Sequence, residues 1–78
     1  MKTLDDAKRL ARQRSEEQDA EFFAVEIAYD DEYSTYHAMT EDSLAESDTI
    51  HFDPIAHVSY FDGRIEQDFG PRGARWAG

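Results

Sequence analysis

The fold is decided by residues 21–40, EFFAVEIAYDDEYSTYHAMT. Residues 21–29 alternate between two faces with a period of two, which is typical of a strand. One of these faces carries Phe23, Val25, Ile27 and Tyr29. A polar turn follows at 30–32, and the alternation resumes over 33–40. The stretch therefore predicts a β-hairpin.

A helix is predicted before this hairpin, over residues 3–20. Thr3 can cap its start, with Asp6 three residues on, and acidic side chains suit the positive end of a helix. An apolar stripe at helical spacing follows: Leu4, Ala7, Leu10 and Ala11. Because the stripe stops at Ala11, residues 13–19 either extend the helix into solvent or lie beyond its end.

A short helical turn is predicted after the hairpin, near 41–46, with Thr40 as its cap. Leu44 can then face the core. A third short strand is expected at 49–52, where Asp53-Pro54 closes it.

A second hairpin is the clearest local signal toward the C-terminus. Residues 56–61 and 64–69 flank Asp62-Gly63, the signature of a two-residue type I′ turn. We expect a single α+β domain over 1–70 and a flexible tail at 71–78. In this domain the N-terminal helix packs on a four-stranded, mostly antiparallel sheet, in two layers.

The charge of the chain is distributed very unevenly. From Ser15 through Gly63, fourteen Asp or Glu occur without one Lys or Arg, and the whole chain carries −10. Such a charge repels nucleic acid and anionic membranes at long range, so we expect the chain to bind neither. The complementary partner is a basic nucleic-acid-binding protein or ribonucleoprotein complex.

Size and composition indicate an intracellular domain with a folded core. The 78 residues include no Cys, so no disulfide framework is available. Aromatic residues make up 13% of the chain, which disordered acidic segments rarely contain. No apolar run approaches the ~20 residues of a membrane span, and the N-terminus has no apolar signal region. We therefore expect a cytoplasmic protein.

No enzyme or cofactor motif stands out. Ligand clefts typically occupy about 300–1,000 Å³, which is hard to fit into so small a domain. Asp53 and the three histidines could be zinc ligands, but their spacing is not that of ligands on a helix. The histidines are His37, His51 and His57. We expect ordinary sheet histidines, no cofactor and no catalysis, with a small metal-binding protein as an alternative.

The acidic residues gather at two places, the 30–32 turn and the 41–48 connection. An exposed tyrosine beside carboxylates is a good anchor for an Arg- or Lys-rich partner, through cation–π contact and ion pairing. The predicted contact residues are Asp30, Asp31, Glu32, Tyr33, Glu41, Asp42, Glu46 and Asp48.

Solubility and haloadaptation could each also account for the acidity. Negative charge alone keeps a small domain in solution. Haloadaptation is suggested by Arg exceeding Lys six to two and Asp exceeding Glu ten to eight. In that case the chain is a haloadapted housekeeping domain. Ordinary surfaces mix both signs, so the single-sign tract favours a functional surface.

In its size, its acidic tract from Glu16 to Asp62 and its interspersed tyrosines, the chain resembles a class of small acidic proteins. These are the proteins that phages and plasmids encode against host defence, including anti-CRISPR and anti-restriction inhibitors. The resemblance implies a non-enzymatic inhibitor or modulator that binds a basic nucleic-acid-binding surface, including as a DNA mimic. It would act in the cytoplasm of the host cell.

Overall fold

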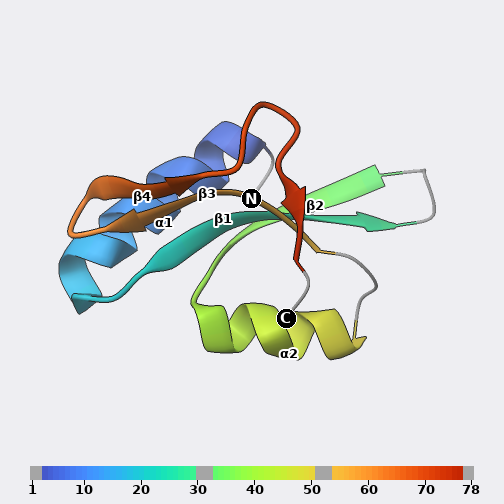
Figure 1. Cartoon of the computed structure of the whole chain (residues 1–78), viewed down its shortest axis with the longest axis horizontal. Coiled ribbons are helices and arrows are strands. Elements are labelled where there is room, and N and C mark those ends of the chain that lie inside the picture. Colours follow the sequence, from blue (N-terminus) through green and yellow to red (C-terminus); the bar gives the residue numbers. More distant parts are fainter. Residues whose placement is uncertain (1–2, 30–32, 51–53, 77–78) are drawn as a thin grey trace.

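The computed structural model describes residues 3–29, 33–50 and 54–76, with the backbone alone at 48–50. It confirms an α+β fold with a helix packed on an antiparallel sheet (Figure 1). The elements are α1 (Leu4–Gln18), β1 (Phe22–Tyr29), β2 (Tyr33–Met39), α2 (Glu41–Ile50), β3 (Ile55–Phe61), β4 (Arg64–Asp68) and β5 (Ala74–Arg75). Neither helix of the described chain has the length and apolar character needed to cross a bilayer.

The sheet has the strand order β2-β1-β3-β4, and β5 pairs with β3 as well. All these pairs are antiparallel. The register between β1 and β3 shifts, because Ala24 lies opposite Val58 whereas Val25 lies opposite Ala56. His57 is therefore an extra residue on β3, as in a β-bulge.

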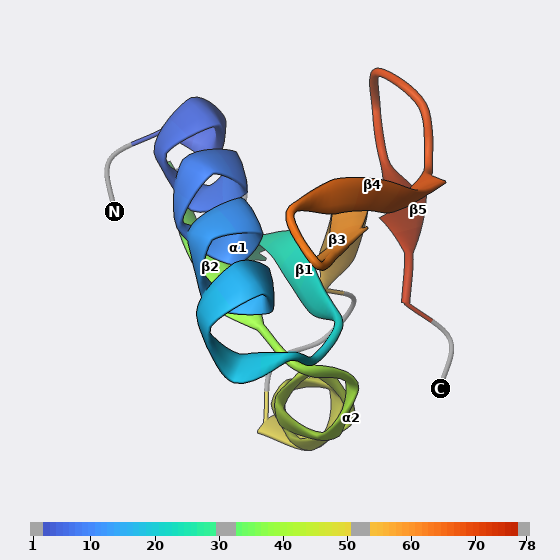
Figure 2. The same cartoon turned by 90° about the vertical axis from the view of Figure 1, so that its left-hand side faces the viewer.

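The core lies on both faces of β1. On one face Phe22 and Ala24 pack with Ala7 and Ala11 of α1. The other face buries three β1 side chains against α2 and β3: Phe23, Val25 and Ile27, with Leu44 and Ala56. Figure 2 shows the two helices on different sides of β1. The sequence predicted two layers, but the structure has three. The third layer is α2, because the turn predicted at 41–46 is a ten-residue helix that buries Leu44.

The N-terminal helix begins as predicted and is fixed at its far end by a turn. The Asp6 amide donates to Thr3 Oγ1 at 3.1 Å. The helix runs to Gln18 and is not fully solvated after Ala11, since Ser15 is completely buried. The Gly63 amide donates to Ser15 Oγ at 3.0 Å, and its carbonyl accepts from Arg12 Nε at 2.9 Å. Both backbone groups of Gly63 are therefore bound by α1.

The turn between β3 and β4 confirms the second predicted hairpin. Phe61 pairs with Arg64 across two residues, Asp62 and Gly63. Their φ angles are 53° and 75°, in the left-handed region that a type I′ turn requires at both positions.

The strand predicted at 49–52 is wrong where the structure describes it. Residues 49–50 belong to the last turn of α2, and residues 51–53 lie outside the described chain. Thr40 Oγ1 accepts from the Ser43 amide at 3.3 Å and starts this helix. Once started, the helix overrides the strand propensity of two residues at its end.

Residues 74–76 do not form part of the flexible tail that was predicted at 71–78. Ala74 and Arg75 pair with β3. The Trp76 amide donates to the Pro54 carbonyl at 2.8 Å, and its ring packs edge-on against Phe23 at 5.6 Å. Packing against the cluster that contains Phe23 and Leu44 removes apolar surface of the ring from water, and this hydrophobic free energy favours the ordered position. Residues 77–78 lie outside the described chain.

Candidate functional site

Of the predicted contact residues, the acidic ones whose side chains the structure describes all lie on the exposed side of α2. Glu41, Asp42 and Glu46 are exposed, while Leu44 is fully buried. No Lys or Arg occurs between residues 41 and 50. At 1.5 Å per residue, Glu41 and Glu46 lie about 7.5 Å apart along the axis. Three carboxylates in that length approach the charge density of one DNA strand, about one charge per 3.4 Å.

Tyr33 lies at the other end of β2 from these acids. Its side chain is 59% exposed, and its ring stacks on Tyr29 with centroids 5.0 Å apart. The ends of β1 and β2 that carry this pair project past both helices (Figure 1). Met39 lies six positions after Tyr33 along β2, which corresponds to about 20 Å. The predicted contact residues that the structure describes therefore lie in two separate places.

Half of the predicted contact set lies outside what the structure describes. This half consists of Asp30, Asp31, Glu32 and the side chain of Asp48. The described half is divided between the two ends of β2, with Tyr33 at its start and the α2 acids after its end.

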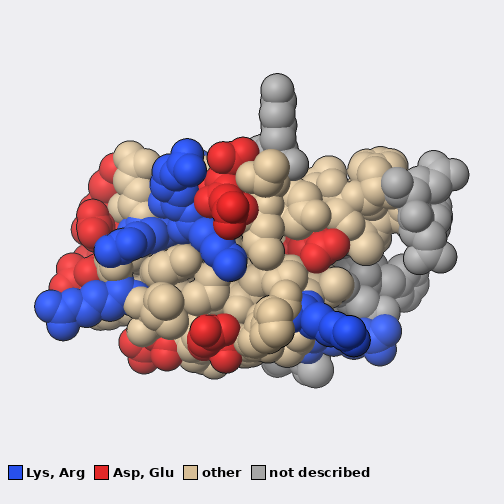
Figure 3. All heavy atoms as spheres, turned by 90° about the horizontal axis from the view of Figure 1, so that it is seen from above, with Lys and Arg blue, Asp and Glu red and all other residues tan. Residues whose placement is uncertain are grey.

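The surface is not uniformly acidic. Figure 3 shows Lys and Arg interspersed with Asp and Glu on the face seen from above Figure 1. On α1, Arg9 pairs with Asp6 at 3.8 Å. A long-range negative potential is therefore weakened near α1, and α2 keeps its carboxylates without a neighbouring cation on the same helix.

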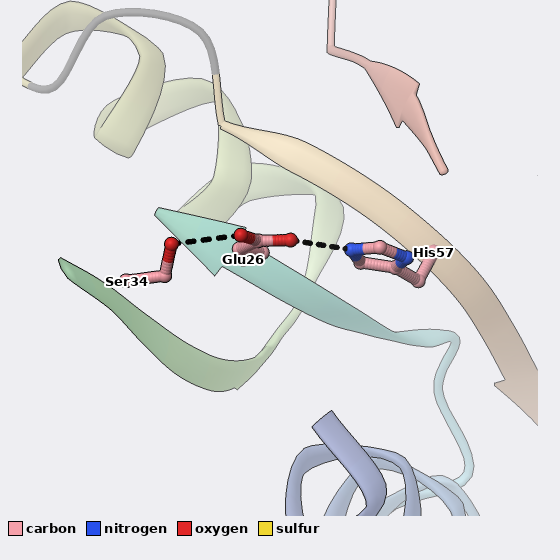
Figure 4. A network of polar contacts seen from close by, with 3 residues as sticks. All are labelled: Glu26, Ser34 and His57. Carbon is pink, nitrogen blue, oxygen red and sulfur yellow. Dashed lines mark hydrogen bonds and ion pairs between the residues drawn. The ribbon is translucent and has the colours of Figure 1, made fainter. Parts of the chain in front are cut away.

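A partly buried polar cluster crosses three strands of the sheet (Figure 4). Ser34 Oγ of β2 donates to one carboxylate oxygen of Glu26 at 2.7 Å. His57 Nε2 of β3 lies 3.0 Å from the other carboxylate oxygen. His57 is only 6% exposed, and the Glu26 side chain is 22% exposed. Sequence reasoning missed this cluster, although a carboxylate within the apolar run of β1 needed partners.

These contacts keep Glu26 ionised. Burial by itself raises the pKa of its carboxyl. The hydrogen bonds from Ser34 and His57 and the attraction of the imidazole outweigh burial, and the pKa is lowered from 4.5. Since an ionised carboxylate only accepts, Nε2 of His57 is the donor in this contact.

The cluster does not have the order of a nucleophilic triad. In such a triad the imidazole lies between hydroxyl and carboxylate, so that it can take the proton of the hydroxyl. Here Glu26 lies between Ser34 and His57. The other imidazole nitrogen, Nδ1, faces Gly73, where an added Cβ would come within 2.9 Å of it. The geometry is that of a tie holding β1, β2 and β3 together.

A pocket of about 250 Å³ lies beside this tie. Its lining combines charged, aromatic and small residues: Lys8, His57, Val58, Tyr60, Ile65, Asp68, Gly70 and Pro71. Burial raises the pKa of Tyr60, Arg12 opposes this, and Asp68 and Asp5 add to it. The pocket is slightly smaller than the roughly 300–1,000 Å³ of typical ligand sites.

The two histidines that the structure describes do not converge. His57 lines a pocket together with Lys8 of α1, whereas His37 pairs in register with Val25, which packs in the cluster of Leu44. His37 Nε2 lies 2.8 Å from Thr35 Oγ1. Across the described residues, no three His, Asp or Glu side chains are grouped so that they could hold a metal ion. His51 and Asp53 are not among those residues.

Comparison with protein-family models, with curated proteins and with solved structures gives no match to this chain. A function must therefore be inferred from the acidic helix α2, the exposed strand β2 and the contacts of Glu26 with Ser34 and His57.

Proposed function

We propose that the chain is a non-enzymatic binding protein that engages the basic, nucleic-acid-binding surface of a protein or ribonucleoprotein complex. By occupying that surface it inhibits or modulates the complex. The observation that carries this proposal is α2, whose exposed Glu41, Asp42 and Glu46 have no cation on the same helix.

Binding competes with nucleic acid for the same surface. Carboxylates at the spacing found on α2 offer Lys and Arg side chains a charge density close to that of a phosphate backbone. Long-range attraction speeds the encounter and weakens steeply as salt rises. Tyr33 adds an exposed ring on which an Arg guanidinium can stack.

The test removes the charge of α2 without changing its shape. In the variant E41Q/D42N/E46Q, affinity for an arginine-rich peptide at low salt should fall about tenfold, since three exposed ion pairs are lost. The salt dependence of the remaining affinity should be shallower than that of the wild type. Isothermal titration measures both quantities, and circular dichroism checks that the helices persist.

The matched control is D5N/E17Q/E66Q, which removes three exposed carboxylates from α1 and β4. It reduces the net negative charge by the same amount as the α2 variant and should keep most of the affinity. Equal losses in the two variants would mean that only bulk charge matters. The acidity would then serve solubility or haloadaptation.

A further inference from the structure

Strand β2 forms one edge of the described sheet. The strand order places it at the end, next to β1 alone. The pairing with β1 continues without a register shift from Phe23 opposite Met39 to Tyr29 opposite Tyr33. None of the seven β2 residues is buried, whereas most residues of β1 and β3 are. The outer side of β2 is therefore within reach of another chain.

The two edges of the sheet differ in their protection against further pairing. Proteins usually protect an edge with charges, proline, a bulge or a short strand. β4 has only five residues, includes Arg64, Glu66 and Asp68, and shifts register against β3. β2 reads YSTYHAM and contains no Asp, Glu, Lys, Arg, Pro or Gly. Only the β4 edge carries these protections.

The charges beside β2 decide what can pair with it. Exposed Glu41 and Asp42 follow its C-terminal end across Thr40. In the sequence, three acidic residues precede Tyr33. A second copy of this chain would bring acidic ends against acidic ends in either strand direction, and each copy carries −10. A segment with basic ends and an uncharged middle is complementary to this edge.

We propose that the edge of β2 accepts an extended segment of the basic partner as an additional strand of the sheet. The proposal rests on the proposed function, which supplies a basic partner, and adds the way that partner binds. Main-chain hydrogen bonds to β2 hold the uncharged middle of the segment. Its Lys or Arg residues contact Glu41 and Asp42, and Tyr33 provides a ring at the other end.

Two synthetic peptides separate strand pairing from charge attraction. Both have arginine and lysine at each end. The pairing peptide has a middle of alternating valine and threonine, and the control has proline in place of each threonine, which removes main-chain donors. The pairing peptide should bind about tenfold more tightly, because the control lacks several main-chain hydrogen bonds. On its addition, amide hydrogen exchange should slow in β2 and stay unchanged in β4.

Each outcome has one meaning. Equal binding of the two peptides, or protection in β4 instead of β2, overturns strand addition and leaves the proposed function standing. Failure of both peptides to bind overturns the two together. Dimerisation in sedimentation, with β2 protected in the absence of peptide, would make a second copy the occupant and also overturn the proposal.

Protein variants give a second measurement. E41Q/D42N removes the carboxylates beside β2 and should weaken binding of the pairing peptide several-fold. D5N/E66Q removes two exposed carboxylates elsewhere and should change it little. Equal effects of the two variants would count against Glu41 and Asp42 as the contacts of the basic ends.

Discussion

Glu26 shows at the scale of one residue how this acidic chain tolerates a carboxylate inside its sheet. Its pKa is lowered from 4.5 by the contacts with Ser34 and His57, which outweigh burial. The unfolded chain therefore binds this proton more readily than the folded one. The contribution of Glu26 to stability is fully present above pH 4.5 and is lost as pH falls through its lower folded pKa.

We expect E26Q to flatten this part of the pH dependence. Urea unfolding at a series of pH values should show the wild type losing stability below pH 4.5 more steeply than E26Q. At neutral pH, E26Q should be less stable, because a neutral amide replaces the charged acceptor of two hydrogen bonds. E66Q, at an exposed position of β4, should keep the wild-type slope. The tie has no role in stability if E26Q also keeps that slope.

The helix α2 shows how one buried side chain positions a charged element. Among the α2 side chains described, Leu44 alone is buried, and it packs in the cluster of Phe23. L44A should cost about 2–5 kcal/mol through lost burial and a cavity. Hydrogen exchange should show α2 losing protection before β1. The same variant should weaken binding of an arginine-rich peptide, because the carboxylates are no longer held together.

A second variant, A45G, distinguishes the loss of the Leu44 side chain from a general weakening of α2. A45G weakens the same helix at an exposed position and leaves Leu44 in place. It should lower protection in α2 without the full loss of stability. If L44A lowered protection equally in α2 and β1, the helix would unfold only with the whole domain and would not be a separate unit.

Elements governed by neighbouring residues were predictable, and those governed by distant ones were not. The Thr3 cap, the alternation of β1 and the Asp62-Gly63 turn depend on a few adjacent residues, and all three are confirmed. Ser15 is polar and lies in a polar stretch, so its burial against the Gly63 turn, 48 residues away, leaves no local signal. Trp76 likewise joins the core through Phe23, which only the folded chain brings near.

The same division holds for the candidate site. Glu41, Asp42 and Glu46 could be named from charge and a helical pattern, and the structure shows all three exposed, while their contact role stays a prediction. The Glu26–His57 contact could not, because it depends on the β-bulge that makes His57 an extra residue on β3. A strict period-two pattern over β3 assumes one residue opposite each residue of β1, so it does not predict the bulge.

At the scale of the whole molecule, folding and partner binding should respond to salt in opposite directions. The net charge of −10 repels itself, so lowering the salt should reduce stability modestly. The fold is also held by two apolar clusters, one on each side of β1, and by the hydrogen bonds of Gly63 with Arg12 and of Glu26 with His57. These contacts do not require salt to screen the surface charge, so the domain should stay folded at millimolar salt. Affinity for an arginine-rich peptide should instead be highest there and fall as salt rises. Circular dichroism and titration over one salt series measure both. A chain that unfolds at low salt would be haloadapted, because its acidic surface would then need salt to fold rather than a basic partner to bind.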